Sequence, residues 1–216
     1  MKTQTLESQL LFAQNALANA LGNNEVKTMM AELGYDKIRL QEGQVLHSTA
    51  SELQTTQVKE YGEQFAATDA MNNARAAANG EYIKHVKIAR ISLQGDRGAF
   101  ESLQLNGRRK QSISGWLKQA KVFYANAINS PDILSALGRF GVTTKKLKAA
   151  QSLVSKVETK LNEQLREKGE AQHTTQQRDK AFDALQDWMG DFVGISRIAL
   201  ESKPQYLEML GIVEPS

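Results

Sequence analysis

The chain of 216 residues contains no cysteine, which excludes disulfide bonds and thiolate metal sites. The formal net charge is only +3, a weaker basic bias than a dedicated nucleic-acid-binding protein usually has. No apolar run approaches the roughly 20 residues that a membrane-spanning helix needs. We therefore expect a soluble protein with no membrane segment. The missing cysteine suits the reducing cytoplasm, which we expect as its location.

Helix-breaking and strand-forming residues are also scarce. There are only three prolines, and aromatic residues make up 6% of the chain. Alanine, leucine, glutamine, lysine and glutamate dominate, and all of these favour helices. No segment shows a convincing strand pattern, so the composition and periodicity predict an all-α fold.

One long pattern occurs twice. The stretch HVKIARISLQGDRGAFESL begins at His85, and FVGISRIALESKPQYLEML begins at Phe192, 107 residues later. Aligning the chain with itself at this spacing gives 25 identities in 109 pairs without a gap, where chance would give roughly seven or eight. The period is far longer than the repeats of solenoid proteins. We therefore expect a tandem duplication, with repeat units at 1–107 and 108–216 packed as one body about a pseudo-two-fold axis.

Helix boundaries match between the two repeats. Asn23 and Ser130 precede short apolar-periodic runs, and Pro131 follows at the first helical position, a strong start signal. Gly34 and Gly141 lie where such a short helix would end in the left-handed conformation. These residues predict one short helix at the same place in each repeat.

Two longer segments, 36–94 and 143–201, become highly polar near their centres, around Gly62 and Gly169. We interpret each as a hairpin of two antiparallel helices, so that each repeat has three long helices and two short ones. A single long helix is the alternative, because glycine inside a helix costs only about 1 kcal/mol relative to alanine.

Catalytic and metal-binding patterns are missing from the chain. None of the three histidines is matched by a histidine in the other repeat, and His85 aligns with Phe192, so we expect its ring to pack half-buried. Glu81 and His85 are spaced i, i+4, and the second repeat has no such pair. Gly-rich phosphate loops and nucleophile elbows are absent. We expect no enzymatic activity, no metal and no cofactor.

Arg90 and Arg197 occupy matching positions in apolar stretches near the end of the last long helix. We expect each guanidinium to brace the following turn, bonding carbonyls near Gly95 or Ser202 or pairing with an acid of the last short helix. The alternative is an anion or small-molecule site, used once in each repeat.

Asn19 and Asn126 also match, near the end of the first helix of each repeat. We expect a structural role for both, because asparagine near a helix end commonly bonds backbone groups. A buried amide that links two helices is the other form of this role.

Basic residues gather at two places in the second repeat, with Trp116 among them. Basic side chains with an interleaved aromatic can bind phosphate backbones and stack bases. A solvated linker and helix face is the simpler explanation. The candidate nucleic-acid-binding residues are Arg108, Arg109, Lys110, Lys118, Lys121, Lys145, Lys146 and Lys148.

The sequence favours a non-enzymatic scaffold or protein-binding module. Its expected working surfaces are a groove along the pseudo-two-fold axis and the hairpin tips near residues 60–70 and 167–177. Nucleic-acid binding through the basic clusters is the second hypothesis, and anion binding at Arg90 and Arg197 is the third.

Overall fold

The helix-capping residues work where the sequence predicts them. Oδ1 of Asn23 accepts hydrogen bonds from two backbone N–H groups in the first turn of the helix that follows. Oγ of Ser130 accepts one such bond in the same way. Gly34 and Gly141 have φ of +86° and +73° and end those helices in the left-handed region, which favours glycine. Both predicted short helices are confirmed.

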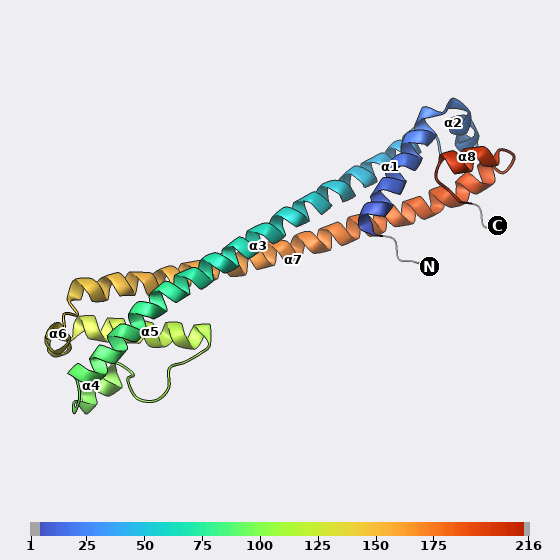
Figure 1. Ribbon diagram of the computed structural model, residues 1–216. Helices are drawn as coiled ribbons and strands as arrows, with labels where there is room; N and C mark the ends of the chain where they lie inside the picture. Colours follow the sequence, from blue (N-terminus) through green and yellow to red (C-terminus); the bar gives the residue numbers. More distant parts are fainter. Residues whose placement is uncertain (1–4, 214–216) are drawn as a thin grey trace. The chain divides into compact units, whose positions relative to one another are not determined.

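The computed structural model describes residues 5–213, and within that range it contains eight helices and no strand (Figure 1). The predicted all-α class is confirmed. The helices are α1 (Leu6–Gly22), α2 (Asn24–Ala31), α3 (Lys37–Ser92), α4 (Arg97–Ser102), α5 (Ile113–Asn129), α6 (Pro131–Gly138), α7 (Thr144–Ala199) and α8 (Pro204–Met209).

Helix bounds follow the 107-residue period of the sequence. Adding 107 to the first and last residue of α1, α2, α3 and α4 gives the bounds of α5, α6, α7 and α8. The local signals of the two repeats therefore produce the same succession of helices.

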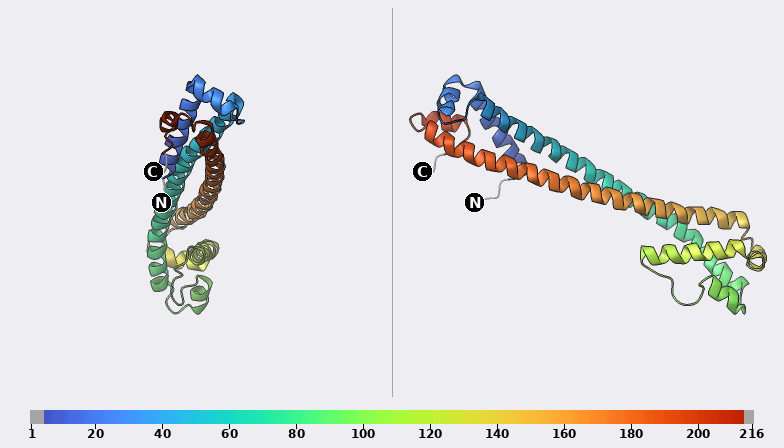
Figure 2. Two further views of the ribbon diagram at one scale, coloured as in Figure 1. Left: turned by 90° about the vertical axis from the view of Figure 1, so that its right-hand side faces the viewer. Right: turned by 180° about the vertical axis from the view of Figure 1, so that it is seen from behind.

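The predicted hairpins are wrong. Both α3 and α7 are single helices of 56 residues, and each is drawn without a break in Figure 2. Gly62 and Gly169 lie inside these helices. The cost of about 1 kcal/mol for each glycine is offset by the surrounding residues, many of which have high helix propensity. The expected hairpin tips at 60–70 and 167–177 are consequently ordinary helical segments.

The helices are divided between two compact units. Unit 1 comprises the chain up to Gly62 and from Glu170 onward, and unit 2 comprises Glu63–Gly169. Unit 1 thus holds α1, α2, the first part of α3, the last part of α7, and α8. Unit 2 holds the last part of α3, α4, α5, α6 and the first part of α7. Each unit therefore combines the first half of one sequence repeat with the second half of the other, whereas the predicted boundary at residue 107 follows the repeat.

The core of unit 1 has large rings on α7, and one of them lies against a glycine of α3. Trp188 and Phe192 stack with ring centroids 5.5 Å apart, and Tyr35 meets both edge-on. The indole lies on Gly43 of α3: a Cβ atom there would be 2.5 Å from Cη2 of Trp188. The buried face of α1 is small, with three alanines and Leu17.

The core of unit 2 has two of its large rings on α5 instead. Phe123 and Tyr124 of α5 are fully buried and meet Tyr82 of α3 at centroid distances of 5.5 and 6.2 Å. His85 lies beside them and is buried rather than half-buried as predicted, with 4% of its surface exposed. Its Nδ1 lies 3.1 Å from the hydroxyl of Tyr124, so the two side chains share a hydrogen bond.

The two matched asparagines link helices that come from different repeats. Asn19 of α1 donates to the carbonyl of Met209 at 2.6 Å, and Asn126 of α5 donates to the carbonyl of Ser102 at 2.7 Å. Both acceptors are the last residue of a short helix, α8 or α4. The structural role is confirmed, in a form that joins a short helix of one repeat to the first helix of the other repeat.

Among residues 5–213, no helix combines the length and the apolar character needed to cross a membrane.

Candidate nucleic-acid interface and anion pocket

The two units differ strongly in formal charge. Unit 2 contains 18 lysines and arginines against 9 acids, a formal charge of +9, whereas unit 1 contains 9 against 15, a charge of −6. The sequence repeats differ much less: residues 1–107 carry 10 basic and 12 acidic residues, and residues 108–216 carry 17 and 12. The small net charge of +3 therefore conceals one strongly basic unit.

All eight residues predicted to bind nucleic acid lie in unit 2, and all are exposed. The first three, 108–110, belong to the loop between α4 and α5. Lys118 and Lys121 lie on the face of α5 opposite its buried residues, as a helical period requires. The remaining three, Lys145, Lys146 and Lys148, lie in the first turns of α7.

Most of these cations are available to a ligand. Lys121 pairs with Glu158 of α7 at 2.5 Å, and Lys146 donates to the carbonyl of Gly141 at 2.9 Å. The described part of the chain contains no hydrogen-bond or ion-pair partner for the ammonium groups of the other three lysines on α5 and α7. Those three are Lys118, Lys145 and Lys148.

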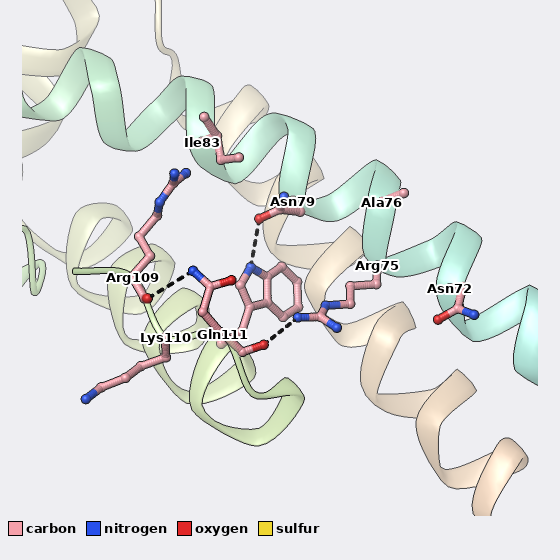
Figure 3. A pocket seen from close by; sticks show the side chains of 9 residues that line it. Asn72, Arg75, Ala76, Asn79, Ile83, Arg109, Lys110 and Gln111 are labelled. Carbon is pink, nitrogen blue, oxygen red and sulfur yellow. Dashed lines mark hydrogen bonds between the residues drawn. The ribbon is translucent and has the colours of Figure 1, made fainter.

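A pocket of about 290 Å³ lies between α3, the α4–α5 loop and α5 (Figure 3). Two of the predicted residues, Arg109 and Lys110, line it, whereas the lysines of α5 and α7 do not. Arg75 of α3 joins them. Sequence reasoning missed Arg75, a lone cation in an alanine- and asparagine-rich segment that aligns with Phe182 in the other repeat. The only sequence signal was helical spacing, which puts it on one face of α3 with Asn72.

Hydrogen bonds hold the walls of this pocket together. Arg75 donates from Nη2 to the carbonyl of Gln111 at 2.8 Å, and Trp116 donates from Nε1 to Oδ1 of Asn79 at 3.0 Å. The backbone N–H of Lys110 donates to the side chain of Gln119. The loop is thus tied to both helices, which gives the pocket a defined shape.

Close packing at Gly115 also fixes the loop. A Cβ atom at this position of α5 would lie 2.9 Å from Cβ of Lys110 and 2.9 Å from Oγ of Ser112. The absence of a side chain at residue 115 therefore lets the loop approach the first turn of α5.

The two matched arginines are used to hold the backbone. Arg90 donates to the carbonyl of Leu105 at 2.9 Å, and Arg197 donates to the carbonyl of Val213 at 3.4 Å. Their acceptors follow the last short helix of each repeat, farther along the chain than the predicted turns near Gly95 and Ser202. These bonds favour the bracing role, and anion binding at the two arginines stays a prediction.

Burial disfavours the charged forms of both His85 and Tyr124. Burial lowers the pKa of His85 and raises that of Tyr124. Burial also raises the pKa of Tyr82 to about 12, against an opposing effect of Arg109 and Arg90. The matching residues of unit 1 are Phe192 and Leu17, which are apolar, so the polar pair replaces part of an apolar core.

Unit 1 has an apolar groove at the corresponding place, between α1 and α7. It measures about 320 Å³ and is lined by Gln9, Phe12, Leu185, Gln186, Met189, Gly190 and Val193. In this groove Gln186 donates a hydrogen bond to Gln9 at 2.6 Å. In the 107-residue alignment these two residues match Asn79 and Trp116, which are hydrogen-bonded to each other in unit 2. The two matched pairs of residues therefore border an apolar groove in unit 1 and a cationic pocket in unit 2.

Comparison of the chain with protein-family models, with curated proteins and with solved structures found no match.

Proposed function

We propose that this chain is a non-enzymatic nucleic-acid-binding protein and that unit 2 provides the binding surface. The observation that carries the proposal is the charge of +9 in one compact unit of a chain with a net charge of +3. A nucleic acid is a dense row of phosphates, and cations that neutralise them release counterions and drive binding. The missing cysteine and this partner together favour a cytoplasmic location.

The start of α7 is well suited to a phosphate backbone. The first backbone N–H groups of a helix point outward and favour an anion. Lys145 and Lys148 belong to the first turns of α7, and neither ammonium group has a partner in the described part of the chain. Lys118 adds a further free cation on α5.

Fluorescence anisotropy with labelled single- and double-stranded DNA, measured over a series of salt concentrations, tests this proposal. The double variant K118A/K148A removes two free cations from unit 2, and K37A/K180A removes two exposed lysines from unit 1 as a matched control. We expect the first variant to weaken binding and to lower the slope of log affinity against log salt by about 2. The control should leave both unchanged. Equal effects of the two variants, or no binding by the natural chain at low salt, would contradict the proposal.

A protein partner is the second candidate function, because both repeats expose large apolar side chains at the same positions. Leu33 and Phe140 are 43% and 51% exposed, and Ile91 and Ile198 are 63% and 64% exposed. In unit 2, Arg139 donates to the carbonyl of Ser92, which brings Phe140 and Ile91 to the same end of the unit. An I91S/F140S variant that loses a cross-linked host protein and still binds DNA would support this function.

We also propose that the chain arose by tandem duplication of a unit of 107 residues. The 25 identities in register, the matching helix bounds and the repeated asparagine bonds support this origin. Since each compact unit takes half of each repeat, we infer that the ancestor was a dimer that exchanged halves between its two copies.

A further inference from the structure

The pocket of unit 2 is lined by cations and amides and by no carboxylate. Of its nine lining residues, Arg75, Arg109 and Lys110 are cationic and Asn72, Asn79 and Gln111 carry amides. Figure 3 shows Arg75 and Arg109 on opposite sides of Gln111, with the ammonium of Lys110 directed away from Arg75. The lining itself provides no negative charge to neutralise the two guanidinium groups.

The unused polar groups of the pocket are mainly donors. Because an indole can only donate, its bond to Asn79 fixes the amide with Oδ1 toward Trp116 and leaves the NH2 group for another acceptor. Arg75 uses one N–H for the carbonyl of Gln111 and keeps others. In the described part of the chain, the guanidinium of Arg109 has no partner. A ligand rich in acceptors and negatively charged would satisfy these groups.

We propose that this pocket binds one phosphate group, presented by a nucleic-acid backbone or by a free phosphate compound. A phosphate has oxygen acceptors in several directions, and guanidinium groups bind such oxygens with short, charge-assisted hydrogen bonds. The inference rests on the proposed function for the class of ligand, and it assigns a defined anchoring position within the basic unit.

Unit 1 provides an internal comparison for this site. Phe182 replaces Arg75, and Gln186 replaces Asn79 at the matching positions of α7. Gln9 takes the place of Trp116, and the groove there is lined mostly by apolar side chains. Phosphate binding should therefore be restricted to unit 2.

The two tryptophans make the site directly observable. Trp116 contributes its indole N–H to the wall of the pocket, and Trp188 is buried in the core of unit 1. Each gives one indole signal in a ¹H–¹⁵N correlation spectrum, and the variant W188F assigns them. The full-length protein is titrated with sodium phosphate, with a 5′-phosphorylated thymidine trinucleotide, and with sodium chloride at matched ionic strength.

We expect both phosphate compounds to shift the Trp116 signal to saturation and to leave the Trp188 signal in place, while chloride has no such effect. The variant R109A should weaken phosphate binding by about tenfold or more, because a charge-assisted bond is lost. K156A removes the charge of an exposed lysine of α7 outside the pocket and should keep the inorganic phosphate affinity. Neither side chain has a partner in residues 5–213, so both variants should fold.

Other outcomes separate the pocket from the proposed function. If DNA binds in the anisotropy experiment while the Trp116 signal stays in place, the pocket inference is wrong and the basic surface of unit 2 remains. If inorganic phosphate shifts Trp116 and R109A removes the shift while DNA does not bind, the pocket stands and the nucleic-acid function is wrong. Equal losses of phosphate affinity in R109A and K156A would overturn the pocket inference.

Discussion

Units 1 and 2 are built from helices with matching bounds, and they distribute the volume of their cores differently. In unit 1 the large rings Trp188 and Phe192 come from α7, whereas the buried residues of α1 are three alanines and Leu17. In unit 2 the large rings Phe123 and Tyr124 come from α5. Where unit 1 has Phe192, unit 2 has the smaller and polar His85. The comparison indicates that large side chains can come from either of two packed helices, provided that the total side-chain volume still fills the core.

Separating the repeats should have the largest effect. In the complete chain, the buried faces of α1 and α2 belong to a core completed by α7 and α8, which come from the other repeat. We therefore expect a fragment of residues 1–107 to be unfolded as a monomer and to regain helicity as a dimer. Circular dichroism and analytical ultracentrifugation over a range of concentrations measure this.

The fragment of residues 108–216 is the matched partner in that experiment. It should behave in the same way, and a mixture of the two fragments should yield a complex that contains both. A fragment that folds cooperatively as a monomer would contradict the exchange of halves between the repeats.

A smaller effect should come from Gly43 and its counterpart Ala150. Gly43→Ala places a methyl group against the indole of Trp188, and we expect a loss of about 1–3 kcal/mol in the free energy of unfolding. Ala150→Gly should lose about 1 kcal/mol, since glycine lowers helix propensity. Denaturant titration measures both.

The double variant G43A/W188F sharpens this test, because phenylalanine is smaller than the indole. The loss from Gly43→Ala should be smaller in the Trp188→Phe background, a coupling expected of residues in contact. If Gly43→Ala instead stabilises the protein, as its helix propensity alone would predict, Trp188 does not press on Gly43 and the account of the unit 1 core is wrong.

The smallest effect should appear only in acid, at His85. Burial holds the pKa of His85 in the folded protein below its ordinary value of 6.5. The neutral imidazole therefore stabilises the fold above about pH 6.5, and this contribution is lost as the pH falls toward the lowered pKa. Thermal melting of the natural chain should show this loss, and H85F should lack it.

Tyr124→Phe is the control for that experiment. It removes the hydroxyl that bonds the imidazole and keeps the ring buried, so the loss of stability in acid should persist. If H85F and the natural chain lose stability in parallel as the pH falls, His85 is not the group responsible.

Much of the fold was predictable because helix signals are local. Caps at Asn23 and Ser130 and left-handed glycines at residues 34 and 141 act within a few residues of the helix end, and each was identified from the sequence. The hairpins were mispredicted because a rise in polarity around Gly62 and Gly169 is compatible with both a turn and an exposed helix. A cost of about 1 kcal/mol per glycine is too small to decide between them.

The candidate site was only partly predictable. Arg109 and Lys110 were recognised as members of a basic run, but nothing in the sequence indicates that Arg75, more than thirty residues earlier, shares a pocket with them. The excess of positive charge was also hidden, because counting by sequence repeat spreads it over both halves.

The sequence by itself determined the helical class, the succession of short and long helices, and its repetition every 107 residues. Tertiary structure decided which halves pack together, and with that the separation of charge into −6 and +9 and the placement of Arg75 and Arg109 in one pocket. The physical reason is the distance along the chain over which each kind of interaction acts. Caps and helical periodicity act over about one turn, whereas the choice of packing partner depends on burying apolar surface between segments a hundred or more residues apart.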